Sequence, residues 1–127
     1  MFKIAGLDHI VLNTTKTNEM VNFYCKILGC NIEKVQEEFG LTQLRAGDSI
    51  IDLIQTNEDI VSSSPNLNHF CLRITPLDYD ELKAYFDDHG IETYRYGERY
   101  GAQGYGNSFY IKDPEGNEVE LKELSED

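Results

Sequence analysis

The chain has 127 residues, 40% of them hydrophobic and 11% aromatic, which suits one domain with a real core and excludes disorder over most of its length. Eleven Lys+Arg stand against 23 Asp+Glu, a formal net charge of −12. This acidity argues against nucleic acid and against anionic membranes as partners, because both are bound through cations.

The N-terminus and the cysteines indicate a cytoplasmic protein. No stretch approaches the roughly 20 apolar residues that span a bilayer, and Asp8 and His9 interrupt the first apolar run, so we expect no signal peptide. The three cysteines, Cys25, Cys30 and Cys71, are an odd number without C-x-x-C spacing. We therefore expect them to be reduced and buried.

The first half of the chain predicts one strand, one helix and three more strands. Residues 7–13 are short, β-branched and apolar, which is typical of a buried strand. An amphipathic helix follows, capped by Thr15 or Thr17 and ended by Gly29. Its apolar face is formed by Met20, Phe23, Tyr24, Ile27 and Leu28. Strand-like runs then cover residues 30–38, 41–45 and 49–55, and a polar connector covers 56–66.

The second half repeats this order. Residues 67–74 predict a strand, and a helix then begins at Asp78, with Glu81 as its capping-box partner, and ends at Gly90. His89 in its last turn is expected to be solvated. Strands are predicted at 92–96, 107–112 and 118–121, with a turn at 113–117. Each half is therefore predicted to be a βαβββ module.

Alignment of the two halves pairs chemically similar residues. LDHIVL (7–12) matches LNHFCL (67–72), which sets His9 against His69, and the last strands set Asp52 against Glu120. If a pseudo-two-fold axis relates the halves, these four side chains converge on one cleft. Two alternatives remain open: each histidine could be a hydrogen-bonded core residue, and Glu120 could belong to a solvated strand face.

Two imidazoles with one or two carboxylates suit a divalent metal ion such as Zn²⁺, Ni²⁺, Co²⁺, Mn²⁺ or Fe²⁺. Such a set leaves coordination positions open for water and substrate, as in a catalytic site. The absence of a cysteine ligand argues against a structural zinc site.

Five of the eight tyrosines lie between residues 94 and 110, among glycines and beside Arg95 and Arg99. The order of the glycines is not a dinucleotide-binding fingerprint. Two interpretations remain open: a flexible connection between strands, or a substrate lid with aromatic walls and arginines for an anionic group.

The segments LDHIVL, FYCKILG, IIDLI, LNHFCL and DPEGNEVEL together resemble the vicinal oxygen chelate superfamily. This superfamily includes glyoxalase I, fosfomycin-resistance thiol transferases, extradiol dioxygenases and bleomycin-resistance proteins. The resemblance implies an α+β fold in which two βαβββ modules, related by a pseudo-two-fold axis, form a cupped mixed sheet around a metal. It implies a single domain over residues 1–127, with modules at about 5–56 and 66–124.

The resemblance also implies roles for individual residues. The metal ligands fall at His9, His69 and Glu120. Glyoxalase I has a fourth ligand, a glutamate, where this chain has Asp52. Because aspartate is one methylene shorter, two roles stay open: direct ligation through a shift of its strand, or, as we favour, action through a metal-bound water. Glu120 and Asp52 are the expected catalytic residues. The expected substrate-binding residues are Asn13, which replaces the arginine of bacterial glyoxalase I, and Arg73, Arg99, Tyr100 and Tyr105.

These observations predict a small metal-dependent enzyme, a lyase or isomerase of the glyoxalase type. The metal is expected to act as a Lewis acid on a substrate that chelates it through adjacent oxygens, while Glu120 or Asp52 moves the proton. Thiol transfer to an epoxide is the second reaction considered. The opposing hypothesis is a resistance-type protein that sequesters a small molecule without chemistry. We expect a small-molecule substrate and a homodimer.

Overall fold

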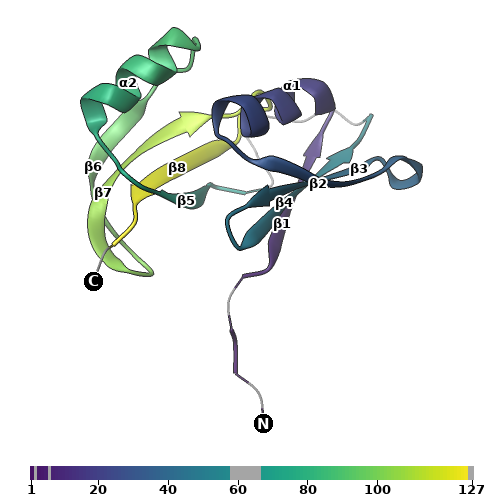
Figure 1. The fold of residues 1–127 in the computed structure, drawn as a ribbon, viewed down its shortest axis with the longest axis horizontal. Coiled ribbons are helices and arrows are strands. Elements are labelled where there is room, and N and C mark those ends of the chain that lie inside the picture. Colours follow the sequence, from purple (N-terminus) through teal and green to yellow (C-terminus); the bar gives the residue numbers. More distant parts are fainter. Residues whose placement is uncertain (2, 6, 58–66, 126–127) are drawn as a thin grey trace. The chain divides into compact units, whose positions relative to one another are not determined.

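The computed structural model of the protein describes residues 1, 3–5, 7–57 and 67–125 (Figure 1). The chain divides into two compact units, Met1–Ser64 and Pro65–Asp127. Each unit has the order strand, helix and three strands, and each holds one four-stranded mixed sheet. The prediction of an α+β fold with two βαβββ modules is confirmed. Of the predicted connector, residues 58–66 lie outside the described residues.

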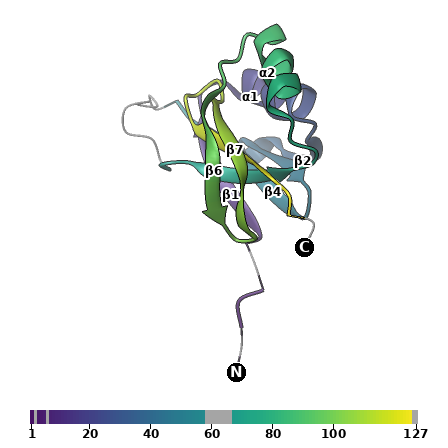
Figure 2. The same cartoon turned by 90° about the vertical axis from the view of Figure 1, so that its left-hand side faces the viewer.

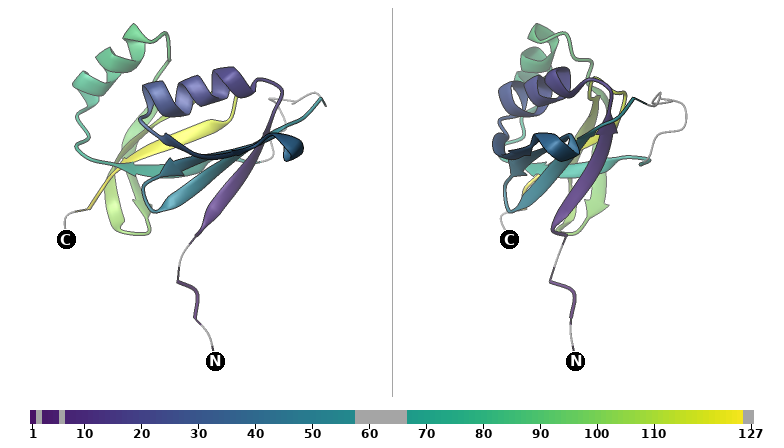
Figure 3. Two further views of the ribbon diagram at one scale, coloured as in Figure 1. Left: turned by 45° about the vertical axis from the view of Figure 1, so that its right-hand side comes forward. Right: turned by 90° about the vertical axis from the view of Figure 1, so that its right-hand side faces the viewer.

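The first unit is a helical segment on one face of a sheet (Figure 3). Its sheet has the order β1-β4-β3-β2, in which β1 runs parallel to β4 and the other neighbours are antiparallel. Its elements are β1 (His9–Thr14), α1 (Thr17–Val21), the π-helical η1 (Asn22–Ile27), β2 (Asn31–Gln36), the short 3₁₀ helix η2 (Glu37–Phe39), β3 (Leu41–Ala46) and β4 (Ser49–Gln55).

Strand alternation separates two faces of this first sheet. Leu12 pairs in register with Leu53, and both are buried on the same face as Leu44. Residues of opposite parity, among them His9 and Asp52, share the other face. The hydrophobic core therefore fixes the register that places these two polar side chains together.

The first helix differs from its prediction in two ways. Lys16, not a threonine, is the N-cap residue, and Thr17 instead donates its hydroxyl to Gln55 at the end of β4. The second half of the helix is π-helical, with Leu28 N–H donating to Phe23 C=O. A π turn holds more residues than an α turn, so later residues are rotated away from the face of the helix that is buried. Met20, Phe23 and Tyr24 are buried, whereas Ile27 and Leu28 are half-buried.

The second unit has the same topology, with the sheet order β5-β8-β7-β6 and β5 parallel to β8. Its elements are β5 (Phe70–Ile74), α2 (Tyr79–Asp88), β6 (Tyr94–Gly101), β7 (Gly104–Lys112) and β8 (Glu118–Glu123). The predicted cap of α2 is confirmed, since the Asp78 carboxylate accepts the backbone N–H of Glu81 at 3.0 Å. Helix α2 covers one face of the sheet (Figure 2), with the ring of Phe86 6.0 Å from that of Phe109.

The glycine- and tyrosine-rich stretch is a long hairpin, so the prediction of a loop is wrong. Strands β6 and β7 pair as far as Gly101 and Gly104, and only two residues lie between them. Tyrosine favours a pleated strand, and along this hairpin that preference outweighs the glycines that predict a break. Gly104, with φ +90°, takes the turn position that needs a left-handed backbone.

The three cysteines are free, and the expectation that they are buried is wrong. Cys71 is exposed because β5 is an edge strand of its sheet, and Cys25 and Cys30 are half-buried. None of the described helices is long and apolar enough to cross a membrane.

Candidate metal centre

In the first unit, a histidine faces a carboxylate across the β1–β4 pair. His9 Nε2 lies 3.9 Å from Asp52 Oδ2, and Asp52 is only 6% exposed. The other ring nitrogen, Nδ1, lies 2.8 Å from the carboxylate of Asp8. The second carboxylate oxygen of Asp52 accepts a hydrogen bond from Gln43 Nε2 at 3.0 Å. We call His9 and Asp52 the first pair.

The second unit holds the equivalent arrangement, which we call the second pair. His69 Nε2 lies 3.4 Å from Glu120 Oε1, and His69 Nδ1 lies 2.7 Å from Asn68 Oδ1. The hydroxyl of Tyr110 is 3.3 Å from the same Glu120 oxygen and 3.4 Å from His69 Nε2. Glu120 is 6% exposed, so the alternative of a solvated strand face is wrong for this residue.

In both the first and the second pair, the Nε2 atom of the histidine faces the carboxylate. Asp8 and Asn68 offer acceptor oxygens to Nδ1, which favours the tautomer in which Nδ1 carries the hydrogen and Nε2 keeps its lone pair. In the second pair, Nε2 and the Glu120 oxygen are then two acceptors 3.4 Å apart. They repel unless a cation or a proton lies between them, and the one hydroxyl hydrogen of Tyr110 serves only one of the two.

The donor atoms fit a divalent metal. Two ligand atoms about 2.1 Å from a tetrahedral metal ion lie roughly 3.4 Å apart, which is the separation in the second pair. The first pair is wider, at 3.9 Å, and one Asp52 oxygen already accepts from Gln43. The second pair therefore has a separation that suits two ligands of one ion, whereas the atoms of the first pair lie farther apart.

Neighbouring groups shift the pKa of His9 in the first pair and of Tyr110 beside the second pair. The hydrogen bond that the Asp8 carboxylate accepts from His9 raises the pKa of His9 most strongly, desolvation lowers it, and Asp52 raises it further, so the net shift is upward. Burial and the neighbouring Glu120 raise the pKa of Tyr110, so its hydroxyl remains a donor. Protons therefore compete with a metal for His9 as the pH falls.

The structure thus brings the four predicted ligands together as two pairs, one in each unit. Among the described residues, no group of three or more His, Cys, Asp or Glu side chains is placed to hold a metal ion. A single ion shared by both pairs stays a prediction.

Sequence reasoning missed Gln43 and Tyr110, the residues that hydrogen-bond the two carboxylates. They occupy the same place in their modules: Gln43 on β3 pairs in register with Asp52, and Tyr110 on β7 pairs with Glu120. For Tyr110 the sequence held a signal, because the predicted turn at 113–117 sets a hairpin register in which residue 110 faces residue 120.

The predicted substrate-binding residues are dispersed. Asn13 and Arg73 are exposed on the edge strands β1 and β5, on the same faces as the histidine of their unit. Arg99 reaches toward the second pair, with its guanidinium 5.1 Å from the ring centre of Tyr110. Tyr100 and Tyr105 instead contact each other at the hairpin tip, 5.0 Å apart, and are 74% and 71% exposed.

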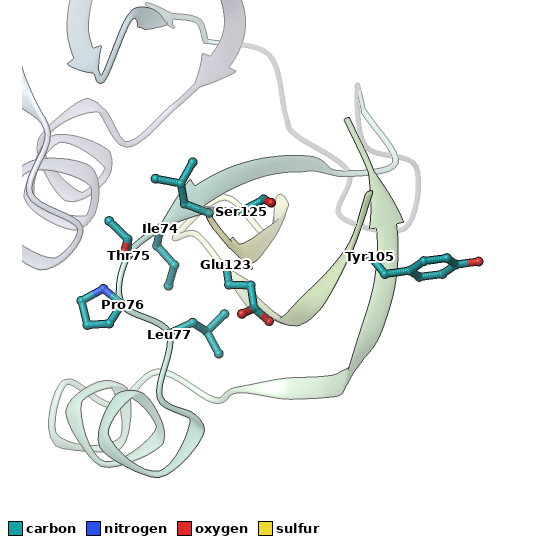
Figure 4. Close-up of a pocket in the computed structure, with 8 residues that line it drawn as sticks. Ile74, Thr75, Pro76, Leu77, Tyr105, Glu123 and Ser125 are labelled. Carbon is teal, nitrogen blue, oxygen red and sulfur yellow. The ribbon is translucent and has the colours of Figure 1, made fainter. Parts of the chain in front are cut away.

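A separate pocket of about 490 Å³ lies in the second unit (Figure 4). It is lined by Ile74, Thr75, Pro76, Leu77, Tyr105, Glu123, Leu124 and Ser125. The ring of Tyr105 points away from the other labelled residues. Neither His69 nor Glu120 lines this pocket, so it is not the space next to the second pair.

A family model of the glyoxalase/bleomycin resistance protein/dioxygenase superfamily matches residues 6–121. The chain belongs to this superfamily. The match spans both βαβββ modules and includes all four residues of the two pairs.

Several solved structures share the fold over nearly the whole chain. An integron cassette protein from the mobile metagenome of V. cholerae is 29% identical, with a TM-score of 0.77 over 98% of this chain and 99% of its own. A lactoylglutathione lyase from Agrobacterium tumefaciens is 22% identical, with a TM-score of 0.71 and 95% of each chain covered. A fosfomycin resistance protein from Listeria monocytogenes is 22% identical, with a TM-score of 0.74 over 94% of this chain and 91% of its own.

Proposed function

We propose that the protein is a divalent-metal-dependent enzyme of the glyoxalase type, acting on a small molecule. His9, His69 and Glu120 would hold the ion, with Asp52 as a fourth ligand or acting through water. The two modules could supply these ligands from one chain or from two chains of a homodimer. We further propose a cytoplasmic location, in keeping with reduced cysteines.

One observation supports this proposal: His69 Nε2 lies 3.4 Å from Glu120 Oε1, a separation that suits two ligands of one metal ion. The imidazole of this pair is held by Asn68 and its carboxylate by Tyr110, so both ligand atoms are oriented before any ion arrives. The first pair repeats the arrangement with Asp8 and Gln43. A protein that only sequesters a small molecule has no need of two such pairs.

When bound, the metal would act as a Lewis acid on substrate oxygens. Glu120 and Asp52 are the groups placed to move a proton, because their carboxylates are buried next to the ligand nitrogens. Tyr110 orients the Glu120 carboxylate through its hydroxyl. Isomerisation of the glyoxalase type needs this combination, and thiol transfer to an epoxide is the second candidate.

The histidines test this proposal against an internal control. His9→Gln and His69→Gln are each expected to weaken Co²⁺ binding at least about 100-fold, because a metal ligand is lost. Binding is measured from the visible absorption of Co²⁺. His89→Gln, at the exposed end of α2, removes the third histidine and is expected to bind Co²⁺ as the wild type does.

Equal Co²⁺ binding by all three variants would contradict the proposal. If the wild type binds Co²⁺ but turns over neither a hemithioacetal nor an epoxide with thiol, the sequestration hypothesis gains instead.

The role of Asp52 is tested separately by Asp52→Asn. Since the first pair is 3.9 Å wide and Gln43 occupies one Asp52 oxygen, we expect the variant to retain one Co²⁺ per site, within about tenfold of wild-type affinity. We also expect a shifted pH dependence of the Co²⁺ spectrum. Complete loss of Co²⁺ would assign direct ligation to Asp52, and no change in either property would make it a bystander.

A further inference from the structure

One residue of the second unit has a backbone conformation that glycine adopts far more easily than other residues do. Among the residues that the structure describes, Arg95 on β6 is the only one other than glycine with a positive φ, at +53°. For a side chain as large as arginine, this left-handed conformation costs free energy, and such strain persists only where the surrounding structure imposes it. The position of Arg95 is therefore set by its contacts and not by its own backbone preference.

The positive φ belongs to a β-bulge. Where the register of β6 against β7 shifts, Arg95 and Tyr96 together stand opposite one residue, Phe109. The ring of Tyr96 stacks on Phe109, 5.8 Å away, on the face of the sheet that α2 covers. In a regular strand, residue 95 would share that face. The extra residue of the bulge instead turns Arg95 to the opposite face.

On that opposite face, the guanidinium group of Arg95 makes three contacts. It donates to Glu118 Oε2 on β8 at 3.1 Å, and its central carbon lies 5.8 Å from the ring centre of Tyr94 and 5.5 Å from that of Tyr110. A cation over the face of a tyrosine ring is attracted by the electrons of the ring. Arg95 therefore ties the edge strand β6 to both of the strands beside it, β7 and β8.

Tyr110 connects Arg95 to the second pair. It is only 6% exposed, and its hydroxyl oxygen lies 3.3 Å from Glu120 Oε1 and 3.4 Å from His69 Nε2. The guanidinium of Arg99 contacts the same ring, 5.1 Å from its centre. The hydrogen of a phenol lies in the plane of its ring, so the plane in which the ring is held decides whether the hydroxyl can donate to Glu120.

We propose that Arg95 is a positioning residue: from the bulge of β6 it holds the plane of the Tyr110 ring, and through the hydroxyl of Tyr110 it orients the Glu120 carboxylate. That this carboxylate serves a metal ion rests on the function proposed above, whereas the restraint on the Tyr110 ring does not. In the first unit, Gln43 takes the place of Tyr110, and an amide has no ring face for a cation to hold.

The test records the ring signals of Tyr110 by NMR in metal-free, full-length protein with ¹³C-labelled tyrosine rings, assigned with Tyr110→Phe. Arg95→Asn removes the guanidinium and keeps a residue that tolerates a left-handed backbone. The Arg95 side chain is 58% exposed, so its ion pair adds little to stability and we expect an unchanged urea midpoint. The Tyr110 ring is expected to flip about three- to tenfold faster, because a cation–π contact is lost.

Arg45→Asn is the matched control. Arg45 pairs at 2.5 Å with Glu33, the extra residue where β2 shifts its register against β3, so the variant removes a guanidinium from the corresponding place in the first unit. Its Tyr110 ring is expected to flip as in the wild type. Arg95→Lys keeps a cation without the planar fork, so we expect a rate between those of wild type and Arg95→Asn.

Equal flip rates in the wild type and Arg95→Asn would overturn the proposal and leave Arg95 as an ion pair at the sheet edge. If Arg95→Asn loses the dispersed amide spectrum of the folded protein, the same comparison is made with Arg95→Lys, and equal rates there would overturn it in the same way.

Co²⁺ titration of the same variants separates this proposal from the proposed function. We expect Arg95→Asn to bind Co²⁺ at least about threefold more weakly than the wild type, because the Glu120 carboxylate is less well oriented. A faster ring with unchanged Co²⁺ affinity would overturn the step from Tyr110 to Glu120. Absence of Co²⁺ binding by the wild type would contradict only the proposed function, since the ring measurement needs no metal.

Discussion

Replacement of Glu120 by glutamine is expected to lower divalent-metal affinity at least about 100-fold and to abolish metal-dependent turnover. Glutamine keeps the side-chain size and an oxygen that accepts from Tyr110, but it loses the negative charge needed both to hold a cation and to take up a proton. Isothermal titration with Zn²⁺ measures the affinity, and the amide spectrum checks the fold.

Glu98→Gln provides the matched control for this variant. Glu98 is exposed on β6, so the same chemical change there is expected to leave metal affinity unaltered. If Glu120→Gln binds Zn²⁺ as tightly as the control does, Glu120 is a buried structural carboxylate held by Tyr110, and it is not a metal ligand.

Replacement of Phe109 by alanine is expected to lower the free energy of unfolding by about 3–5 kcal/mol, the largest effect on stability that we predict. Phe109 is 1% exposed, and its ring contacts Phe86 and Tyr79 of α2 and Tyr96 of β6. The substitution leaves a cavity between the helix and the sheet. Urea denaturation followed by the amide signals of the second unit measures the loss.

Tyr85→Ala is the control for Phe109→Ala. Tyr85 lies on the same helix and contacts Phe86, but it is 40% exposed, so its loss is expected to cost below about 1 kcal/mol. A similarly small loss in Phe109→Ala would show that α2 is not packed on the sheet through this ring.

The internal repeat was the strongest guide to the fold and to the pairs. It set His9 against His69 and Asp52 against Glu120, and in the structure each histidine faces the carboxylate of its own module. The sequence could show which residues face each other because polar and apolar side chains alternate along buried strands, and an error of one residue in register would expose the core. For that reason, the strands that carry the two pairs could be aligned from the sequence, whereas the cap of the first helix could not.

Features that depend on tertiary context could not be predicted. The π-helical half of the first helix has no signal in an apolar pattern that an ordinary α-helix fits equally well. In the β6–β7 hairpin, glycines indicated a break, but a Cβ at Gly106 would lie close to the side chains of Lys122 and Glu123 on β8. Gln43 became visible only once the β3–β4 register was known.

The central claim is that both histidines ligate one divalent metal ion. X-ray absorption spectroscopy of the Zn²⁺-loaded protein, together with its metal content, tests this most directly. We predict one ion for each set of His9, His69 and Glu120, with two imidazole nitrogens and at least one carboxylate oxygen in its ligand shell. A shell with fewer than two imidazoles, or a protein that takes up no Zn²⁺, would contradict the account.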